Sequence, residues 1–275
     1  MKFLRNIAIL LFCLFVVDIV RYFVIPDVEG LARKTPETTA FMRYRVEAWR
    51  RAGYSGRKTD RKVVPLSAIS KNVVKAVLIA EDDKFWQHDG FDYDAMEHAL
   101  EKNLKERKIA MGGSTVSQQL AKNLYLSPSK NPVRKIKEAI LTWRIERSLS
   151  KSRILELYLN SAEWGDGIFG IEAAARHYYG TSAGRLNARQ ASRLAAVLPN
   201  PIRWSPTGSS RYVRKRSAII YRIMQKRGIV APSYGGRVPL PVDTTATAAA
   251  SDTITIGVPR ELIDGVFMDS GEGGN

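Results

Sequence analysis

Residues 74–90 read VKAVLIAEDDKFWQHDG, and one carboxylate in this stretch bears on both the fold and the chemistry. Val74, Val77 and Leu78 recur at helical spacing, and Glu81 falls on the same face. Burying a carboxylate is costly, because desolvation disfavours its charged form and raises its pKa. Proteins tolerate that cost mainly where the carboxylate has a partner or transfers a proton. The stretch therefore predicts a helix that carries Glu81 as a candidate buried acid or base.

The chain is strongly basic, with 43 Lys and Arg against 27 Asp and Glu in 275 residues and a formal charge of +16. This balance indicates an anionic partner such as nucleic acid, anionic lipid or a phosphorylated substrate. The basic residues form no standard nucleic-acid motif, so we expect no nucleic-acid partner. The single Cys13 excludes a disulfide within the chain and a Cys-based zinc site, and the three histidines show no metal-ligand spacing.

Residues 7–25 form an apolar segment of 19 residues, close to the ~20 needed to cross a bilayer. Asp18 and Arg21 interrupt it, but they are three apart on a helix and could pair or extend toward the interface. The segment therefore predicts one transmembrane helix.

The basic residues Lys2 and Arg5 precede this segment, which predicts that the N-terminus stays in the cytoplasm and the rest lies outside the cytoplasmic, or inner, membrane. The alternative is a cleaved signal peptide with an apolar core at 7–17 and a weak cleavage candidate at 30–32. That candidate lies rather far from the apolar core, so we favour the uncleaved anchor.

The remaining sequence is helical in pattern almost throughout, without sustained two-residue alternation. Its end is rich in Ala, Thr, Gly and Ser, which is typical of a mobile tail. We predict a cytoplasmic N-terminus (1–6), an anchor (7–25), a juxtamembrane segment (26–62), one all-α domain (63–230) and a mobile tail (231–275).

A second segment, residues 112–123, begins with two glycines and continues with Thr115 and Gln118 at the spacing of a capping box. The unpaired N–H groups at such a helix start suit a phosphate or diphosphate. Thr115, Gln118, Gln119 and Lys122 would line one face. The alternative is an ordinary capped helix with polar surface residues.

A third segment places Arg134 and Lys135 one helical turn before Glu138. Leu141 and Ile145 continue the face of Glu138, which makes it a second carboxylate at the head of an apolar stripe. By itself, this segment is read more simply as an ion pair on a helix surface.

A fourth segment, residues 156–160, ends a helix, and residues 162–170 follow as a shaped turn with three glycines. Glu163 in that turn is a candidate third acid, although a solvated turn carboxylate is the simpler interpretation. His88 lies close to Glu81 in sequence, where we expect it to orient the local backbone rather than bind a metal.

Two glutamates on apolar faces could share general-base and leaving-group roles, as paired carboxylates do in sugar chemistry. The cations at positions 122, 134 and 135 could bind a diphosphate, and an anchor would keep the site near a lipid-linked substrate. Glycosyl transfer from a lipid diphosphate would use all of these features.

The four segments, in this order, resemble the four signatures of the peptidoglycan glycosyltransferases (glycosyltransferase family 51). The first signature is matched at Glu81, Asp82, Phe85, His88 and Gly90, and the others at 112–119, 134–138 and 156–160. The stretches 160–180 and 199–206 resemble the monofunctional biosynthetic transglycosylases in particular. The resemblance covers about residues 63–228 and implies a lysozyme-like α-helical domain.

The resemblance implies that lipid II is polymerised into β-1,4 glycan with inversion, and that undecaprenyl diphosphate is released. It gives Glu81 the role of the general base and Glu138 that of assisting the leaving diphosphate, directly or through Mg²⁺ or Mn²⁺, with no organic cofactor. It implies a substrate-binding set made of Asp82, Phe85, His88, Gly113, Ser114, Thr115, Gln118, Gln119, Lys122, Asn123, Arg134 and Lys135.

In the family, the stretch between the first two signatures is mobile and meets the membrane. Here it spans about residues 91–111 and carries Lys102, Lys105, Arg107 and Lys108, which would face anionic lipid head groups. Expected partners are lipid II, the growing glycan strand and membrane lipids, with cell-wall synthesis or division proteins as further candidates.

Many relatives also carry a transpeptidase domain, but here two Ser-x-x-Lys matches occur without a Lys-Thr-Gly motif, so we expect no transpeptidase activity. The alternatives are a lysozyme-like enzyme that cleaves glycan (a muramidase or lytic transglycosylase) and a non-enzymatic membrane-anchored scaffold. A cleaving enzyme would have no need of the cations around a diphosphate.

Overall fold

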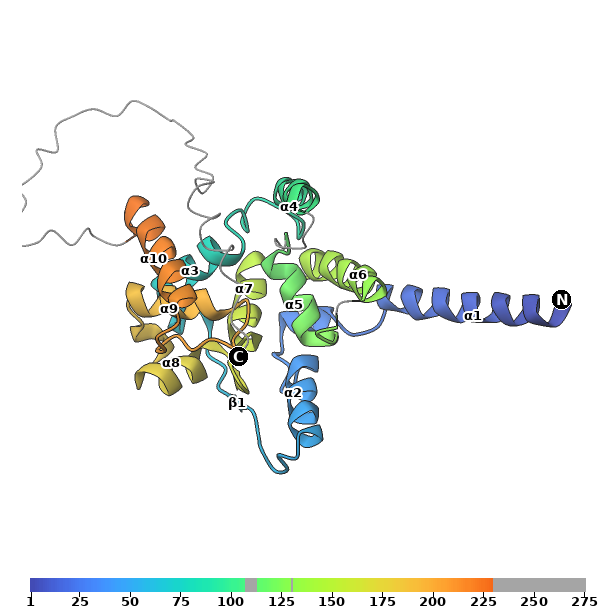
Figure 1. Cartoon of the computed structure of the whole chain (residues 1–275), viewed down its shortest axis with the longest axis horizontal. Coiled ribbons are helices and arrows are strands. Elements are labelled where there is room, and N and C mark those ends of the chain that lie inside the picture. The colour runs from blue at the N-terminus through green and yellow to red at the C-terminus, as the bar shows by residue number, and fades with distance from the viewer. Residues whose placement is uncertain (107–112, 130, 230–275) are drawn as a thin grey trace, which may run out of the picture.

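The computed structural model describes residues 1–106, 113–129 and 131–229, and this part of the chain is mainly helical (Figure 1). The all-α prediction is confirmed. The predicted tail at 231–275 lies outside the described residues, as do Arg107 and Lys108. The α-helices are α1 (Lys2–Val20), α2 (Ala40–Arg51), α3 (Lys71–Glu81), α4 (Tyr93–Glu106), α5 (Val116–Tyr125), α6 (Pro132–Ser148), α7 (Lys151–Ser161), α8 (Ile171–Tyr179), α9 (Ala188–Val197) and α10 (Arg211–Lys226). Short 3₁₀ helices are η1 (Arg21–Phe23), η2 (Glu29–Ala32), η3 (Leu66–Ala68) and η4 (Ala183–Arg185).

Helix α1 continues into η1 and extends away from the rest of the protein (Figure 1). The span Lys2–Phe23 is apolar and long enough to cross a membrane, and α1 has no buried residue. Asp18 and Arg21 pair as predicted, with 2.8 Å between Oδ1 and Nη2. The span is compatible with a single-pass anchor.

The helix starts follow local sequence signals. Thr115 caps α5 in a complete capping box, in which the Gln118 side chain accepts from the Thr115 backbone in return. Asn131 caps α6, and Pro132 occupies the first turn, where a helix needs no N–H donor. The capping box that the sequence predicted is therefore confirmed, and it fixes where α5 begins.

One apolar core joins two groups of helices. In the first, α5 packs against α6 and α7, with Leu120, Leu141 and Leu155 fully buried. In the second, α3 packs against α9 and α10, with Val77 and Leu194 fully buried. The backbone N–H of Val116, at the start of α5, donates to Asp82, which directly follows α3, and this contact brings the first two sequence motifs together.

Residues 40–61 pack against the domain that was predicted to begin at 63. Helix α2 contacts α5. Strand β1 (Asp60–Arg61) pairs in parallel with β3 (Ile168–Phe169), and β3 pairs antiparallel with β2 (Glu163–Gly165), giving the order β1-β3-β2. The predicted domain boundaries stay predictions.

Helix α4 occupies most of the stretch that the family resemblance implies to be mobile. Its apolar residues Tyr93, Leu100 and Leu104 are exposed, as is Lys105. An exposed apolar face with a cation beside it suits a membrane surface. Mobility and membrane contact of this stretch stay predictions.

The environment of Glu163, at the start of β2, differs from the one that the sequence predicted. The Glu163 side chain is only 8% exposed, and Arg45 of α2 donates to both of its oxygens at 2.7 and 2.9 Å. The backbone N–H of Gly167 donates to the same carboxylate at 3.0 Å. The interpretation of Glu163 as a solvated turn carboxylate is therefore wrong, because α2 covers it.

We predict that Gly167→Ala destabilises the fold by about 2 kcal/mol or more, as measured by urea unfolding. Gly167 has a φ of +80°, and a Cβ there would lie 2.1 Å from Cη2 of the buried Trp49 ring. The matched control is Gly53→Ala, at a φ of +86° with no atom within 4 Å of the new Cβ. It should cost about 1 kcal/mol from backbone strain alone. Equal losses in the two variants would contradict this view of the turn.

Candidate active site

Glu81 is the last residue of α3, and its side chain contacts α5 and α10. Gln119 Nε2 donates to Glu81 Oε2 at 2.9 Å, and Arg216 Nη2 lies 3.3 Å from Glu81 Oε1. The Glu81 side chain is only 11% exposed. Burial raises its pKa, while Arg216, Gln119 and Lys122 act in the opposite direction. A carboxyl group with a raised pKa is suited to accept a proton near working pH.

The amide of Gln119 is held in one orientation by Tyr158. The Tyr158 hydroxyl donates to Gln119 Oε1 at 3.1 Å, which leaves the Nε2 group to face Glu81. Burial raises the pKa of Tyr158 well above its ordinary value, so this hydroxyl keeps its proton. Helix α7 therefore fixes the hydrogen-bond donor to Glu81.

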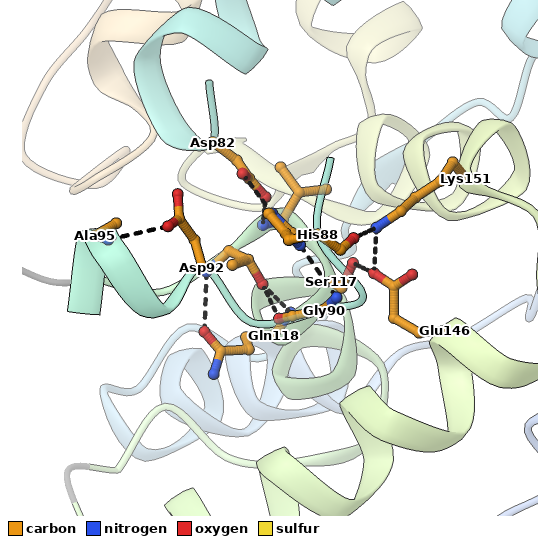
Figure 2. Close-up of polar contacts among 11 residues, drawn as sticks. Asp82, His88, Gly90, Asp92, Ala95, Ser117, Gln118, Glu146 and Lys151 are labelled. Atoms are coloured by element: carbon orange, nitrogen blue, oxygen red, sulfur yellow. Dashed lines mark hydrogen bonds and ion pairs between the residues drawn. The ribbon is translucent and has the colours of Figure 1, made fainter. Parts of the chain in front are cut away.

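Asp82 joins the first motif to the second, as Figure 2 shows. Its Oδ1 is 2.8 Å from His88 Nε2, and its Oδ2 accepts from the backbone N–H of Val116 at 2.8 Å. His88 Nδ1 accepts from the Gly90 N–H at 3.1 Å, so Nε2 carries the proton toward Asp82. The Thr115 hydroxyl donates to the Gly90 carbonyl at 2.7 Å. These contacts hold the turn after α3 against the start of α5, and His88 orients its backbone.

A second set of polar side chains, from α5, α6 and α7, contacts the same turn (Figure 2). Lys151 of α7 lies 2.9 Å from Glu146 Oε1 and also donates to the His88 carbonyl. The Ser117 hydroxyl donates to the same Glu146 oxygen. Glu146 is 6% exposed, so this ion pair is largely shielded from water. Neither Glu146 nor Lys151 stands out in the sequence as a site residue, because both acquire these partners only when α5, α6 and α7 meet.

Glu138 lies on α6 with its side chain 3% exposed. Arg134 contacts one of its oxygens and Lys135 the other. Lys135 Nζ also donates to Ser114 Oγ at 3.1 Å, which links α6 to the segment before α5. The interpretation of Glu138 as part of a surface ion pair is therefore wrong, because the carboxylate is buried beneath its two cations.

Lys122 is electrostatically coupled to both glutamates. Burial lowers the pKa of its ammonium group, and Glu138 and Glu81 act in the opposite direction. The neighbouring Arg134 and Lys135 lower the pKa further. Lys122 is therefore near enough to both glutamates and to both cations for their charges to shift its pKa, and Lys122, Arg134 and Lys135 are together called the cation cluster.

Several predicted substrate-binding residues are buried and already have protein partners. Phe85 is fully buried, and Asp82, Thr115 and Gln118 are at most 7% exposed. We therefore expect these four side chains to support the residues that line the site rather than to contact the substrate themselves. Gly113 lets the chain approach α4, because a Cβ there would lie 3.0 Å from the Cα of Met96.

Asn123 is also buried, one residue beyond Lys122 on α5. Within the described residues, Gln119, Lys122, Ser114, Arg134 and Lys135 are less buried than this group and are better placed to meet a substrate. Arg216 could not be predicted from the motifs, since it lies outside all four, in a basic run at the start of α10.

The described residues contain no group of three or more His, Cys, Asp or Glu that could hold a metal ion. Both Glu138 oxygens already contact cations, so a divalent ion at this carboxylate would lie beside the positive charges of Arg134 and Lys135. The donor set does not fit a metal held by the protein alone. The expectation of Mg²⁺ or Mn²⁺ stays a prediction.

Comparison with known proteins identifies the family to which this sequence is similar. The family model for transglycosylases matches residues 49–225. A biosynthetic peptidoglycan transglycosylase of Methylobacillus flagellatus is 44% identical over 211 residues, covering 77% of this chain and 92% of the relative. Proteins of the same name from Azoarcus sp. and Nitrosospira multiformis are 52% identical over 170 residues (60% of this chain, 71% of the relative) and 42% identical over 221 residues (80% and 96%).

The chain belongs to the transglycosylase family. The resemblance that the four motifs predicted is confirmed, as is the expectation that this protein is a glycosyltransferase enzyme.

We predict that Glu81→Gln raises the free energy of unfolding at pH 7. A carboxyl whose folded pKa lies above its ordinary value of 4.5 binds protons more tightly when folded. Stability is therefore lost as the pH rises from 4.5 through the folded pKa, and a neutral amide avoids that loss. Urea unfolding as a function of pH checks this, and the difference from the wild type should vanish below about pH 4.5.

Asp83→Asn is the matched control, because Asp83, two residues after Glu81, has a side chain that is 42% exposed and pairs with Arg227 at the surface. It should change the free energy of unfolding by less than about 1 kcal/mol in either direction. A Glu81→Gln protein less stable than the wild type at pH 7 would contradict the assignment of Glu81 as a buried carboxyl with a raised pKa.

Proposed function

We propose that this enzyme polymerises lipid II into β-1,4 glycan strands with inversion at C1, releasing undecaprenyl diphosphate, and that it has no transpeptidase activity. The observation that carries the proposal is the contrast between the two buried glutamates. Glu81 has an amide and one more distant guanidinium beside it, whereas Glu138 lies directly beneath Arg134 and Lys135. One carboxylate is thus suited to take a proton, and the other to hold cations in place.

In the proposed reaction, Glu81 accepts the proton of the 4-hydroxyl of the N-acetylglucosamine in lipid II. The hydroxyl oxygen attacks C1 of the growing strand and forms the new glycosidic bond. The bond from C1 to the diphosphate oxygen breaks, and its electron pair leaves with the diphosphate. Attack opposite to the leaving group inverts C1, and the proton remains on Glu81 until solvent removes it.

The cation cluster of Lys122, Arg134 and Lys135 would bind the leaving diphosphate as its charge develops. Preorganised cations stabilise such charge without reorganising during the reaction. Glu138 would hold two of the three cations in place through its direct contacts. This role needs no metal ion, because protein cations meet the diphosphate charge.

The presence of a membrane anchor supports the proposal that the substrate is linked to a lipid. Helix α1 would cross the cytoplasmic membrane once, with Lys2 and Arg5 inside and the catalytic domain on the outer side. The Lys151 ammonium group is engaged by Glu146 and by the His88 carbonyl, which supports the proposal that the Ser-x-x-Lys match of Ser148 and Lys151 is not a transpeptidase pair. Cell-wall synthesis or division proteins are proposed partners that would recruit the enzyme.

We predict that Glu81→Gln lowers the rate of lipid II polymerisation by about 10²- to 10⁴-fold, the range that a general base contributes. The measurement is glycan strand formation by the full-length protein in detergent, with lipid II binding followed separately and expected to persist. Glu47→Gln, which removes a partly exposed carboxylate of α2, should keep the wild-type rate. Cleavage of glycan strands without polymerisation would favour a lysozyme-like enzyme instead, and inactivity of the wild type on both substrates would favour a scaffold.

We predict that Arg216→Gln moves the acidic limb of the kcat/KM profile to higher pH. The Arg216 charge lowers the pKa of Glu81 more than any other neighbour does, so its removal makes the base harder to ionise. Because the base must be ionised, activity would then be lost at a higher pH as the solution is acidified. Arg222→Gln, on an exposed position of the same helix, should leave the limb in place. An unchanged limb in Arg216→Gln would contradict the role of Glu81 as the titrating base.

A further inference from the structure

The outer end of the anchor is docked onto α6, the helix that carries Arg134, Lys135 and Glu138. Asp18 of α1 forms an ion pair with Lys137 of α6, and their side chains are 38% and 16% exposed. These residues are 119 apart in the sequence, so the contact is tertiary. It joins the predicted membrane span directly to the proposed diphosphate site.

Further contacts follow the ion pair along the two helices. Lys137 Nζ lies 5.1 Å from the centre of the Tyr22 ring. Arg144 Nη1 donates to the carbonyls of Tyr22 at 3.1 Å and Pro26 at 2.8 Å. The rings of Phe23 and Trp143 meet edge to face, with centroids 6.1 Å apart. The anchor is therefore attached to α6 over about two helical turns.

Helix α6 contacts the anchor with one face and carries residues of the proposed diphosphate site on a neighbouring face. Lys137 and Arg144 are seven residues apart and share the face toward the anchor. Arg134 and Glu138 are four apart and share the face toward the site. A rotation or tilt of the anchor face would move the site face by the same angle, because one rigid helix carries both.

Membrane insertion alone does not account for the pairing of Asp18 with Lys137. A carboxylate near the end of an apolar span needs a partner, and Arg21 already supplies one at 2.8 Å within the same segment. Lys137 adds a second partner from the catalytic domain. Insertion of the anchor does not require this second partner. The Asp18–Lys137 pair does, however, fix the catalytic domain relative to the anchor.

We propose that Asp18 and Lys137 are positioning residues that hold α6, and with it the cation cluster, at a set height and tilt above the membrane. This inference rests on the proposed function, since it concerns capture of a diphosphate attached to a lipid. A diphosphate that is confined to the membrane surface can be reached only if its receptor lies at the same level. The pair should therefore matter for substrate in a bilayer and little for substrate that can tumble in a micelle.

The docking is tested without any activity assay by cross-linking the full-length protein in liposomes. In a Cys13→Ser background, Asp18→Cys with Lys137→Cys should cross-link rapidly with a short bifunctional thiol reagent. The control is Val17→Cys with Lys137→Cys, since Val17 is 62% exposed and lies a helical step away from Asp18. Equal cross-linking of the two pairs would overturn the docked arrangement.

The positioning role is tested by kinetics on two forms of lipid II. For long-chain lipid II in liposomes, Asp18→Asn and Lys137→Gln should each raise KM by about five- to tenfold, with kcat little changed, as expected when one partner of a partly buried ion pair is lost. With a short-chain lipid II in detergent micelles, the same variants should match the wild type. The double variant Asp18→Lys with Lys137→Glu restores an ion pair with the charges exchanged, so its KM should return most of the way to the wild-type value.

Arg21→Gln is the matched control, because it removes the other partner of Asp18 and leaves the contact with Lys137. It should keep the wild-type KM in liposomes. A defect in Arg21→Gln equal to that in Lys137→Gln, or equal losses in liposomes and micelles with a lowered Tm, would overturn the positioning role. Failure of the wild type to polymerise either form would reject the proposed function, whereas the cross-linking result would still decide whether the anchor is docked.

Discussion

The carboxylate of Asp82 holds the end of α3 against the beginning of α5, and the geometry of the site depends on this contact. One oxygen meets His88 and the other meets the backbone of Val116, each at 2.8 Å. Because Asp82 follows Glu81 directly, this contact places Glu81 beside Gln119, one turn into α5. The carboxylate is also an acceptor for an otherwise unpaired N–H at a helix start, where a negative charge is favoured.

The two buried glutamates of the site have different surroundings. Glu81 meets a neutral amide and a guanidinium at 3.3 Å, and burial dominates its pKa. Glu138 lies beneath two cations that are anchored on its own helix. Different environments for paired carboxyl groups allow them to take different chemical roles. In the proposed mechanism, one moves a proton while the other keeps the diphosphate-binding cations in place.

The sequence was most informative where the structure is local. The spacing of Val77, Leu78 and Glu81 predicted a carboxylate on a buried helix face, and Thr115 with Gln118 predicted the start of α5, since both patterns lie within one or two helical turns. The sequence could not show that Arg216 contacts Glu81 or that Arg45 covers Glu163. These pairs are 135 and 118 residues apart, and their contacts exist only after α10 and α2 pack against the rest of the fold.

The same limit explains the two interpretations of Glu138. Along the chain, Arg134, Lys135 and Glu138 look like an ordinary surface ion pair, because helical spacing says which side chains meet but not which face is covered. Packing of α6 against α5 buries the carboxylate to 3% exposure and brings Lys135 to Ser114. The family resemblance indicated a functional role for these residues, and tertiary packing supplies the physical reason.

The proposed mechanism depends on Glu81 being a buried carboxyl whose pKa is held above its ordinary value. The most direct measurement is a ¹³C NMR titration of protein labelled at the glutamate side-chain carboxyl, with the Glu81 signal assigned by its absence in Glu81→Gln. The proposed mechanism predicts a titration midpoint clearly above the ordinary glutamate value of 4.5. A midpoint at or below that value would show that Glu81 is an ordinary ion-paired carboxylate, and would contradict its assignment as the base.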